Sequence, residues 1–157
     1  MPKQSVVQVF LNENSIIRRS PEVEQERAVA IYDLLESNHF CPVGDLDGPF
    51  HLHLRIEGHS HLVLEIRSEK DEPLCEIGLP LLPLRRLIRD YFQICESYYD
   101  AIKKLTPSQI EIIDMARRGL HNEGSEILAE KLKASVEVDY KTARRLFTLI
   151  CVLHIRG

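Results

Sequence analysis

The sequence predicts a single α+β domain in which a small antiparallel sheet packs against about five helices, with the C-terminal helix at the centre. The chain has 157 residues, 44% of them hydrophobic and 28% charged, which is enough for one buried core. Strand-like alternation comes first and helical periodicity follows, so strands and helices are segregated along the chain. We therefore expect a strand–helix–hairpin part over 1–82 and a helical part over 83–157.

The N-terminal part begins with a β-prone run over 6–11, which asparagines end. Ser20-Pro21-Glu22 then predicts the start of a helix, because serine caps, proline suits the first turn and glutamate favours the positive end of the helix dipole. Apolar residues at helical spacing continue this helix to about residue 35. The turn-rich segment 38–49 is expected to be a link.

A β-hairpin is the clearest expectation. Apolar residues alternate with polar ones over 50–57 and again over 62–67, on either side of Gly58-His59-Ser60. A three-residue loop pairs Leu52 with Ile66 and keeps one face apolar, whereas a two-residue loop would oppose Leu52 to Glu65. A third strand is expected over 74–79, with Pro80 at its end.

The pattern over 83–157 predicts helices. One apolar stripe runs from Leu84 to Ile102, and Thr106-Pro107-Ser108-Gln109 is a capping box that starts the next helix. Gly119 is expected to end that helix, and Gly124-Ser125 to open another. Asp139 is expected to cap the last helix, which is apolar almost all round after Arg145 and is therefore expected to be central.

Composition excludes several classes of protein. The four cysteines are widely spaced and form no C-x-x-C pair, which indicates reduced thiols in a cytoplasmic protein. The longest apolar run, 146–155, is too short for a membrane span. A net charge of −4 argues against a nucleic-acid-binding surface. The common nucleotide-binding and hydrolase motifs are absent from the sequence.

The hairpin carries one candidate for metal chemistry. The expected register places His53 opposite Glu65, Glu57 opposite His61 and His51 opposite Arg67 on the polar face. Two imidazoles two residues apart beside a carboxylate could hold Zn²⁺, but nothing fixes a fourth ligand. We therefore expect a solvated face with cross-strand charge pairs, and neither a metal nor a cofactor.

The segment 117–126 is the densest in polar chemistry, and we expect it to be a short connection between two helices. The candidate binding residues within it are Arg117, Arg118, His121, Asn122, Glu123 and Ser125. Backbone N–H groups at Ser125 could bind an anion, while the arginines could anchor one. The alternative is local helix punctuation with ion pairs. Whether Arg89, Arg118 and Arg144 converge is left open, although neighbouring arginines on a helix point about 100° apart and should not share one face.

Two resemblances accompany this pattern. The segments 105–109, 116–120, 127–132 and 142–145 loosely resemble the helix-turn-helix of response-regulator output domains. The segments 26–35, 94–99, 117–126 and 143–154 more closely resemble uncharacterised protein family 0262 (UPF0262) of alphaproteobacteria. The family resemblance covers nearly the whole chain and implies a bacterial cytosolic protein. It supplies no catalytic residues.

The leading hypothesis is a small cytoplasmic binding or regulatory protein that acts through the polar Arg/His segment. Its partner would be another protein or a small anionic ligand, with a homodimer left open. One alternative is an enzyme acting on an anionic metabolite, with His121 as acid or base and Arg118 as anchor. The other is a helix-turn-helix-like DNA-binding module, against which the apolar last helix argues because a recognition helix needs a polar face.

Overall fold

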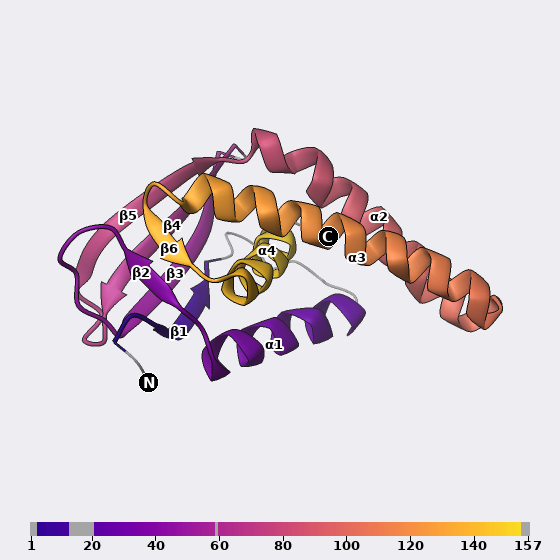
Figure 1. Ribbon diagram of the computed structural model, residues 1–157, viewed down its shortest axis with the longest axis horizontal. Helices are drawn as coiled ribbons and strands as arrows, with labels where there is room; N and C mark the ends of the chain where they lie inside the picture. Colours follow the sequence, from indigo (N-terminus) through magenta and orange to yellow (C-terminus); the bar gives the residue numbers. More distant parts are fainter. Residues whose placement is uncertain (1–2, 13–20, 59, 155–157) are drawn as a thin grey trace.

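The computed structural model describes residues 3–12, 21–58 and 60–154, and it places the strands together at one end of the molecule with the helices beside them (Figure 1). The main sheet has the order β1-β3-β4-β5, formed by β1 (Val6–Leu11), β3 (Phe50–Glu57), β4 (His61–Ser68) and β5 (Pro73–Pro80). The fold is α+β, as the sequence predicts, and forms one domain.

The hairpin register is confirmed residue by residue. Leu52 pairs with Ile66, His53 with Glu65 and Glu57 with His61 across β3 and β4. Leu52 and Ile66 are fully buried. A shift of one residue would move the apolar side chains to the polar face, so burial of one face fixes this register. The third strand is also confirmed, as the edge strand β5.

Two features of the β-structure differ from the prediction. β1 runs parallel to β3, so the main sheet is mixed and not antiparallel. The chain between these strands contains helix α1 (Pro21–Glu36), and a crossover of this length allows parallel pairing. A second sheet pairs β2 (Phe40–Pro42), inside the expected link, with β6 (Val136–Val138). The predicted cap at Ser20 lies outside the described residues.

The described residues contain four helices, one fewer than expected. They are α1, α2 (Leu82–Lys104), α3 (Pro107–Leu132) and α4 (Tyr140–His154). The predicted capping box is present, because Thr106 accepts from the backbone N–H of Gln109 and the Gln109 side chain accepts from the backbone N–H of Thr106. The predicted cap of α4 is also present, since Asp139 Oδ1 accepts from the backbone N–H of Thr142 at 2.9 Å.

The expected connection at 117–126 is wrong, because α3 continues through it without a break. Gly124 is required for packing and not for a turn. A Cβ at this position would lie 2.2 Å from Cζ of Phe147 on α4. The glycine lets the two helices approach closely. Its neighbour Ser125 is small and fully buried, and its hydroxyl donates to the His121 carbonyl within the same helix. The turn required by the helix-turn-helix resemblance is therefore absent from 107–132.

Helix α4 lies in the interior, as predicted, between α1 and α3 (Figure 1). Its buried residues are Thr142, Ala143, Leu146, Phe147, Leu149, Ile150, Cys151 and Val152. Cys95 and Cys151 are also buried, and burial raises the pKa of the Cys95 thiol to about 12, so it is an inert core residue at neutral pH.

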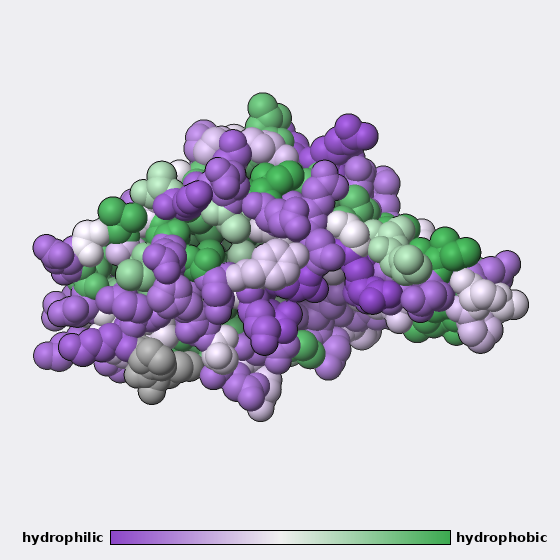
Figure 2. All heavy atoms as spheres, viewed as in Figure 1, coloured by the Kyte–Doolittle hydropathy of each residue, from purple (hydrophilic) through white to green (hydrophobic). Residues whose placement is uncertain are grey.

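Helices α2 and α3 form an antiparallel hairpin joined by only Leu105 and Thr106, and its far end projects beyond the other elements (Figure 1). Hydrophobic side chains are visible on this projecting end (Figure 2). Four hydrophobic residues of the hairpin are at least 43% exposed: Ile102, Leu105, Ile112 and Met115.

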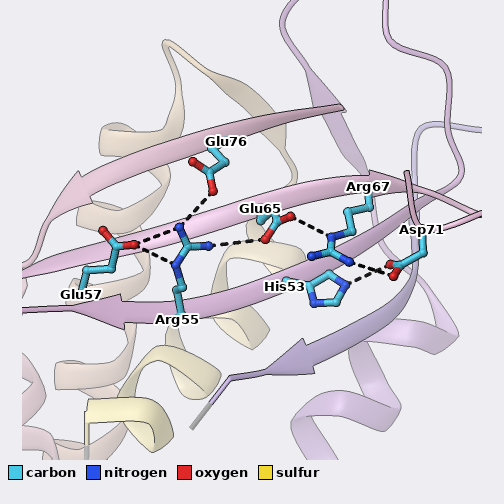
Figure 3. A network of polar contacts seen from close by, with 7 residues as sticks. All are labelled: His53, Arg55, Glu57, Glu65, Arg67, Asp71 and Glu76. Atoms are coloured by element: carbon cyan, nitrogen blue, oxygen red, sulfur yellow. Dashed lines mark hydrogen bonds and ion pairs between the residues drawn. The ribbon is translucent and has the colours of Figure 1, made fainter. Parts of the chain in front are cut away.

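The outer face of the main sheet carries a network of charges (Figure 3). Arg55 contacts Glu57, Glu65 and Glu76, at 2.9, 3.4 and 2.9 Å. Arg67 pairs with Glu65 and Asp71 at 2.8 Å each. The sequence predicts a polar face with cross-strand pairs, and the structure has one.

Candidate functional site: an arginine-lined cleft between helices

A cleft of about 630 Å³ opens between α1, α3 and α4. Its volume lies within the range of small-molecule sites. Helices α3 and α4 supply four arginines and His121, α1 supplies three carboxylates, and α2 supplies two tyrosines. The lining residues are Pro21, Glu22, Gln25, Glu26, Val29, Ala30, Asp33, Tyr91, Tyr99, Arg117, Arg118, His121, Arg144, Arg145 and Thr148.

The acidic wall follows from the periodicity of α1. Glu22, Glu26 and Asp33 are separated by four and seven residues, which places them on one face of the helix. Two of these carboxylates pair with the basic wall. Glu26 lies 3.8 Å from Nη1 of Arg117, and Asp33 lies 3.5 Å from Nη2 of Arg145.

Three of the four arginines have carboxylate partners. Arg117 donates to Asp114 from Nη2 at 2.6 Å and lies 4.7 Å from the centre of the Tyr98 ring. Arg118 contacts Asp114 at 3.1 Å and Glu111 at 3.3 Å. The positive charge of these side chains and of Arg145 is therefore partly compensated inside the protein.

Arg144 differs from the other three. Within residues 3–12, 21–58 and 60–154 it forms no ion pair with a carboxylate. Its Nη1 donates to Oδ1 of Asn122, and its guanidinium lies 5.8 Å from the Tyr140 ring centre. The amide oxygen and the ring orient a half-buried guanidinium without neutralising its charge. The cleft thus contains a positioned cation whose charge no carboxylate of the described residues neutralises.

His121 forms the floor of the cleft and is only 7% exposed. Its Nε2 lies 2.7 Å from Oγ1 of Thr148, and the Thr148 hydroxyl donates to the Arg144 carbonyl at 3.2 Å. Because a hydroxyl carries one hydrogen, we assign the imidazole proton to Nε2. Burial and the nearby charges of Arg144, Arg117 and Arg145 lower the pKa of His121 to about 4, so it is neutral at pH 7.

Aromatic rings surround this histidine. The ring of Tyr91 is 5.4 Å from that of His121, and the ring of Phe147 is 5.2 Å away, both edge-on. The Tyr91 hydroxyl donates to Oε1 of Glu26 at 3.2 Å. Burial raises the pKa of Glu26, although the bond from Tyr91 and the charge of Arg117 act in the opposite direction.

The structure divides the predicted binding residues into three groups. Arg117, Arg118 and His121 line the cleft, and Asn122 accepts a hydrogen bond from Arg144 without lining the cleft. Ser125 is in the core, where it has no exposed backbone N–H to offer an anion. Glu123 is exposed and does not line the cleft.

The structure shows which of Arg89, Arg118 and Arg144 converge. Arg118 and Arg144 line one cleft, whereas Arg89 is outside it, 65% exposed and 3.8 Å from Asp90. The sequence predicts that neighbouring arginines do not share one face of a helix, yet both members of the pairs at 117–118 and 144–145 line the cleft. Long side chains reach around the helix, so a difference in Cβ direction does not prevent convergence.

Sequence reasoning missed the acidic wall and the tyrosines. Glu26 and Asp33 lie within the segment 26–35 that carries the family resemblance, and Tyr99 within 94–99. These residues lie near α3 only because the helices pack together, and no local sequence pattern indicates that packing.

The hairpin histidines do not form a metal cluster. His53 and His51 both face Asp71, at 3.2 and 3.7 Å, and the His53 ring stacks 4.5 Å from Phe10. Among the described residues, no group of three or more His, Cys, Asp or Glu side chains could hold a metal ion.

The fold and the cleft define a small α+β protein with an arginine-lined site between helices. Residues 3–156 match the family described as Uncharacterised protein family (UPF0262), and the chain belongs to this family. No solved structure shows a significant match.

Similar proteins occur in several alphaproteobacteria. The UPF0262 protein of Paramagnetospirillum magneticum is 56% identical over 155 residues, covering 99% of this chain and 98% of that protein. The UPF0262 protein of Azorhizobium caulinodans is 57% identical over 158 residues, covering 99% and 97%. That of Rhodospirillum rubrum is 55% identical over 152 residues, covering 97% and 93%.

Within the described part of the chain, no helix combines the length and the apolar character that crossing a membrane requires.

Proposed function

We propose that this protein is a binding protein whose cleft takes up an anionic group, a carboxylate or a phosphate, with Arg144 as the principal contact. The observation that carries the proposal is the guanidinium of Arg144, which lines the cleft and has no carboxylate partner among the described residues. A guanidinium in a partly desolvated site binds an oxyanion through two parallel hydrogen bonds.

The electrostatics of the floor support this proposal. Burial is the main cause of the lowered pKa of His121, and the charges of Arg144, Arg117 and Arg145 lower it further, so three cations lie near the floor of the cleft. An anion bound there would neutralise Arg144 and would not have to displace an existing salt bridge. Val29, Ala30 and Tyr99 supply apolar surface for the rest of the ligand.

The same geometry favours binding over proton transfer. The proton on Nε2 of His121 is held by Thr148, and Nδ1 faces the buried Ser125 hydroxyl at 3.4 Å. A histidine with a pKa of about 4 is a weak base at neutral pH. We therefore infer that His121 shapes and polarises the floor of the cleft.

We also infer that the protein acts in the cytoplasm. Its four cysteines are all free, which is typical of proteins in a reducing compartment.

The test is a thermal-shift screen followed by calorimetry, with inorganic phosphate, pyrophosphate, citrate and ATP as probes. A probe at a hundred times its Kd should stabilise the wild-type protein by about 2.7 kcal/mol. Arg144→Ala should abolish that shift, and Arg144→Lys should weaken binding because lysine cannot form the paired bonds. The matched control is Arg89→Ala, outside the cleft.

Two results would overturn the proposal. One is the absence of a shift with any of the four probes. The other is a shift that Arg144→Ala and Arg89→Ala reduce equally, since this would indicate a general charge effect and not a site at Arg144.

A further inference from the structure

The exposed side of α3 carries an apolar strip with no partner in the described structure. Ile112, Met115, Ala116 and Gly119 are spaced by three, four and seven residues, so they lie along one side of the helix. All four are exposed, Ile112 by 68% and Met115 by 60%. The strip is on the projecting hairpin, where green side chains are visible in Figure 2.

Gly119 is the residue that the monomer does not explain. Among the described residues, a Cβ built on it would meet nothing within 4 Å, and it lies in the middle of a helix of 26 residues. Glycine at such a position destabilises a helix relative to alanine, with no intramolecular packing in return. Gly124, by contrast, is required by the ring of Phe147. A glycine beside exposed large apolar residues is suited to the close approach of a second helix.

We propose that this strip is the interface of a two-fold symmetric homodimer, in which α3 packs antiparallel against α3 of a second copy with the axis between Ile112 and Met115. A two-fold interface brings one patch against itself, so Ile112 of each copy would contact Met115 of the other. The facing Ser108 would then lie against Gly119, where the missing side chain leaves room.

The charges at the two ends of the strip fit this arrangement. Glu123 lies on the same side of α3 as Ile112, roughly 14 Å from the middle of the Ile112–Met115 pair. In the other direction α3 begins after roughly 10 Å, at the tip of the hairpin where Lys104 ends α2. Antiparallel packing therefore brings Lys104 of each copy towards Glu123 of the other.

Both charged side chains are exposed and available for this contact. Neither Lys104 nor Glu123 has an ion-pair partner in the described ranges 3–12, 21–58 and 60–154. Two-fold symmetry repeats the pair, so each interface would contain two such contacts, and parallel packing would leave both carboxylates facing each other.

The first test is the oligomeric state of the full chain by sedimentation equilibrium over a wide concentration range. The wild-type protein should form dimers, and Ile112→Glu/Met115→Glu should be monomeric because it places four carboxylates at the axis. Tyr32→Glu/Val43→Glu is the matched control, since it changes two residues of equal exposure (68% and 67%) elsewhere, and it should dimerise as the wild type does.

Exchanging the charges of Lys104 and Glu123 tests whether the two copies of α3 pack antiparallel. Both residues are exposed, so their substitution leaves the core intact. Lys104→Glu should weaken the dimer roughly tenfold, because the repulsion occurs twice. The variant Lys104→Glu/Glu123→Lys should restore the wild-type dissociation constant. Circular dichroism of dilute protein checks that each variant is folded.

A wild-type protein that stays monomeric at every concentration overturns the proposal, and so does a dimer that Ile112→Glu/Met115→Glu leaves intact. A charge exchange that fails to restore the dimer overturns the antiparallel arrangement. The anion screen on Arg144 is independent, since that residue is on another helix, and either proposal can fail alone.

Discussion

Gly124 of α3 lies directly against the ring of Phe147 of α4, so close that a Cβ would come within 2.2 Å of Cζ. This contact brings the two helices together where they supply His121 from α3 and Arg144 from α4 to the cleft. The neighbouring bond between His121 Nε2 and Thr148 Oγ1, at 2.7 Å, depends on the same close approach. The packing of one glycine therefore holds α3 and α4 close together beside the candidate site.

Gly124→Ala should destabilise the protein by about 1–3 kcal/mol, because the added methyl group overlaps a fully buried ring. Chemical denaturation measures this change. Gly78→Ala is the control, since a Cβ there meets nothing within 4 Å and the glycine lies in edge strand β5. Equal stability of the two variants would show that α3 and α4 separate more easily than their contact indicates.

The sequence predicts the sheet better than the α3 segment for a physical reason. Hairpin pairing follows from alternation over 50–67, a local pattern that only one register satisfies, and the observed Leu54–Leu64 pair agrees with it. Glycines at 119 and 124 resemble helix punctuation locally. Only the position of Phe147, more than twenty residues away in the chain, shows that Gly124 belongs inside a helix.

The parallel pairing of β1 and the small β2–β6 sheet were beyond local reasoning for the same reason. Each joins segments far apart in the sequence, Val6 with Phe50 and Cys41 with Glu137. Strand direction depends on the path of α1 between them. The three-residue strand β6 is too short to show the alternation that identifies longer strands.

Arg55→Ala tests the charge network on the outer face of the sheet. Its guanidinium contacts three carboxylates, so removal takes this cation from Glu57 and Glu76, while Glu65 keeps Arg67 (Figure 3). We expect a loss of about 1 kcal/mol or less in the free energy of unfolding, decreasing further at high salt. Arg86→Ala, which removes an 84% exposed arginine with one partner at 3.7 Å, should change stability less.

If the loss of unfolding free energy in Arg55→Ala does not change with salt concentration, the charge network does not contribute to stability as we expect. Such a result would indicate lost packing of the aliphatic stem of Arg55 and not lost charge.

Asp139→Ala tests the N-terminal cap of the central helix. The Asp139 carboxylate accepts from the Thr142 backbone N–H, and alanine would leave that donor without its partner. The free energy of unfolding should fall by about 1 kcal/mol, measured by urea denaturation. Asp139→Asn retains an acceptor oxygen and should be close to the wild type, and equal losses for both variants would argue that charge is the cause.

The candidate site was only half accessible to sequence reasoning. Polar density and arginine content drew attention to Arg118 and His121, which do line the cleft. Glu26 and Tyr91 meet through a hydrogen bond between residues 65 positions apart, and nothing in either segment alone indicates it. Solvent exposure also cannot be read locally, which is why Glu123 was grouped with residues on the opposite side of α3.

The buried His121 should make the stability of the protein depend on pH. Its pKa is about 4 in the folded state and 6.5 when unperturbed, so unfolding takes up a proton below about pH 6.5. The free energy of unfolding contributed by this residue should therefore be fully present above pH 6.5 and fall by about 3 kcal/mol as the pH drops to 4. The raised pKa of Glu26 acts in the opposite direction, because the folded state retains that proton more strongly.

The variant His121→Gln isolates the contribution of the histidine, since its amide can donate to Thr148 but does not titrate in this range. Its unfolding free energy should fall less steeply between pH 6.5 and 4 than that of the wild type, and the difference between the two curves removes the effect of Glu26. An NMR titration of the His121 ring protons measures the pKa directly. A midpoint near 6.5, or parallel stability curves, would mean that water reaches the imidazole and that the floor of the cleft is open.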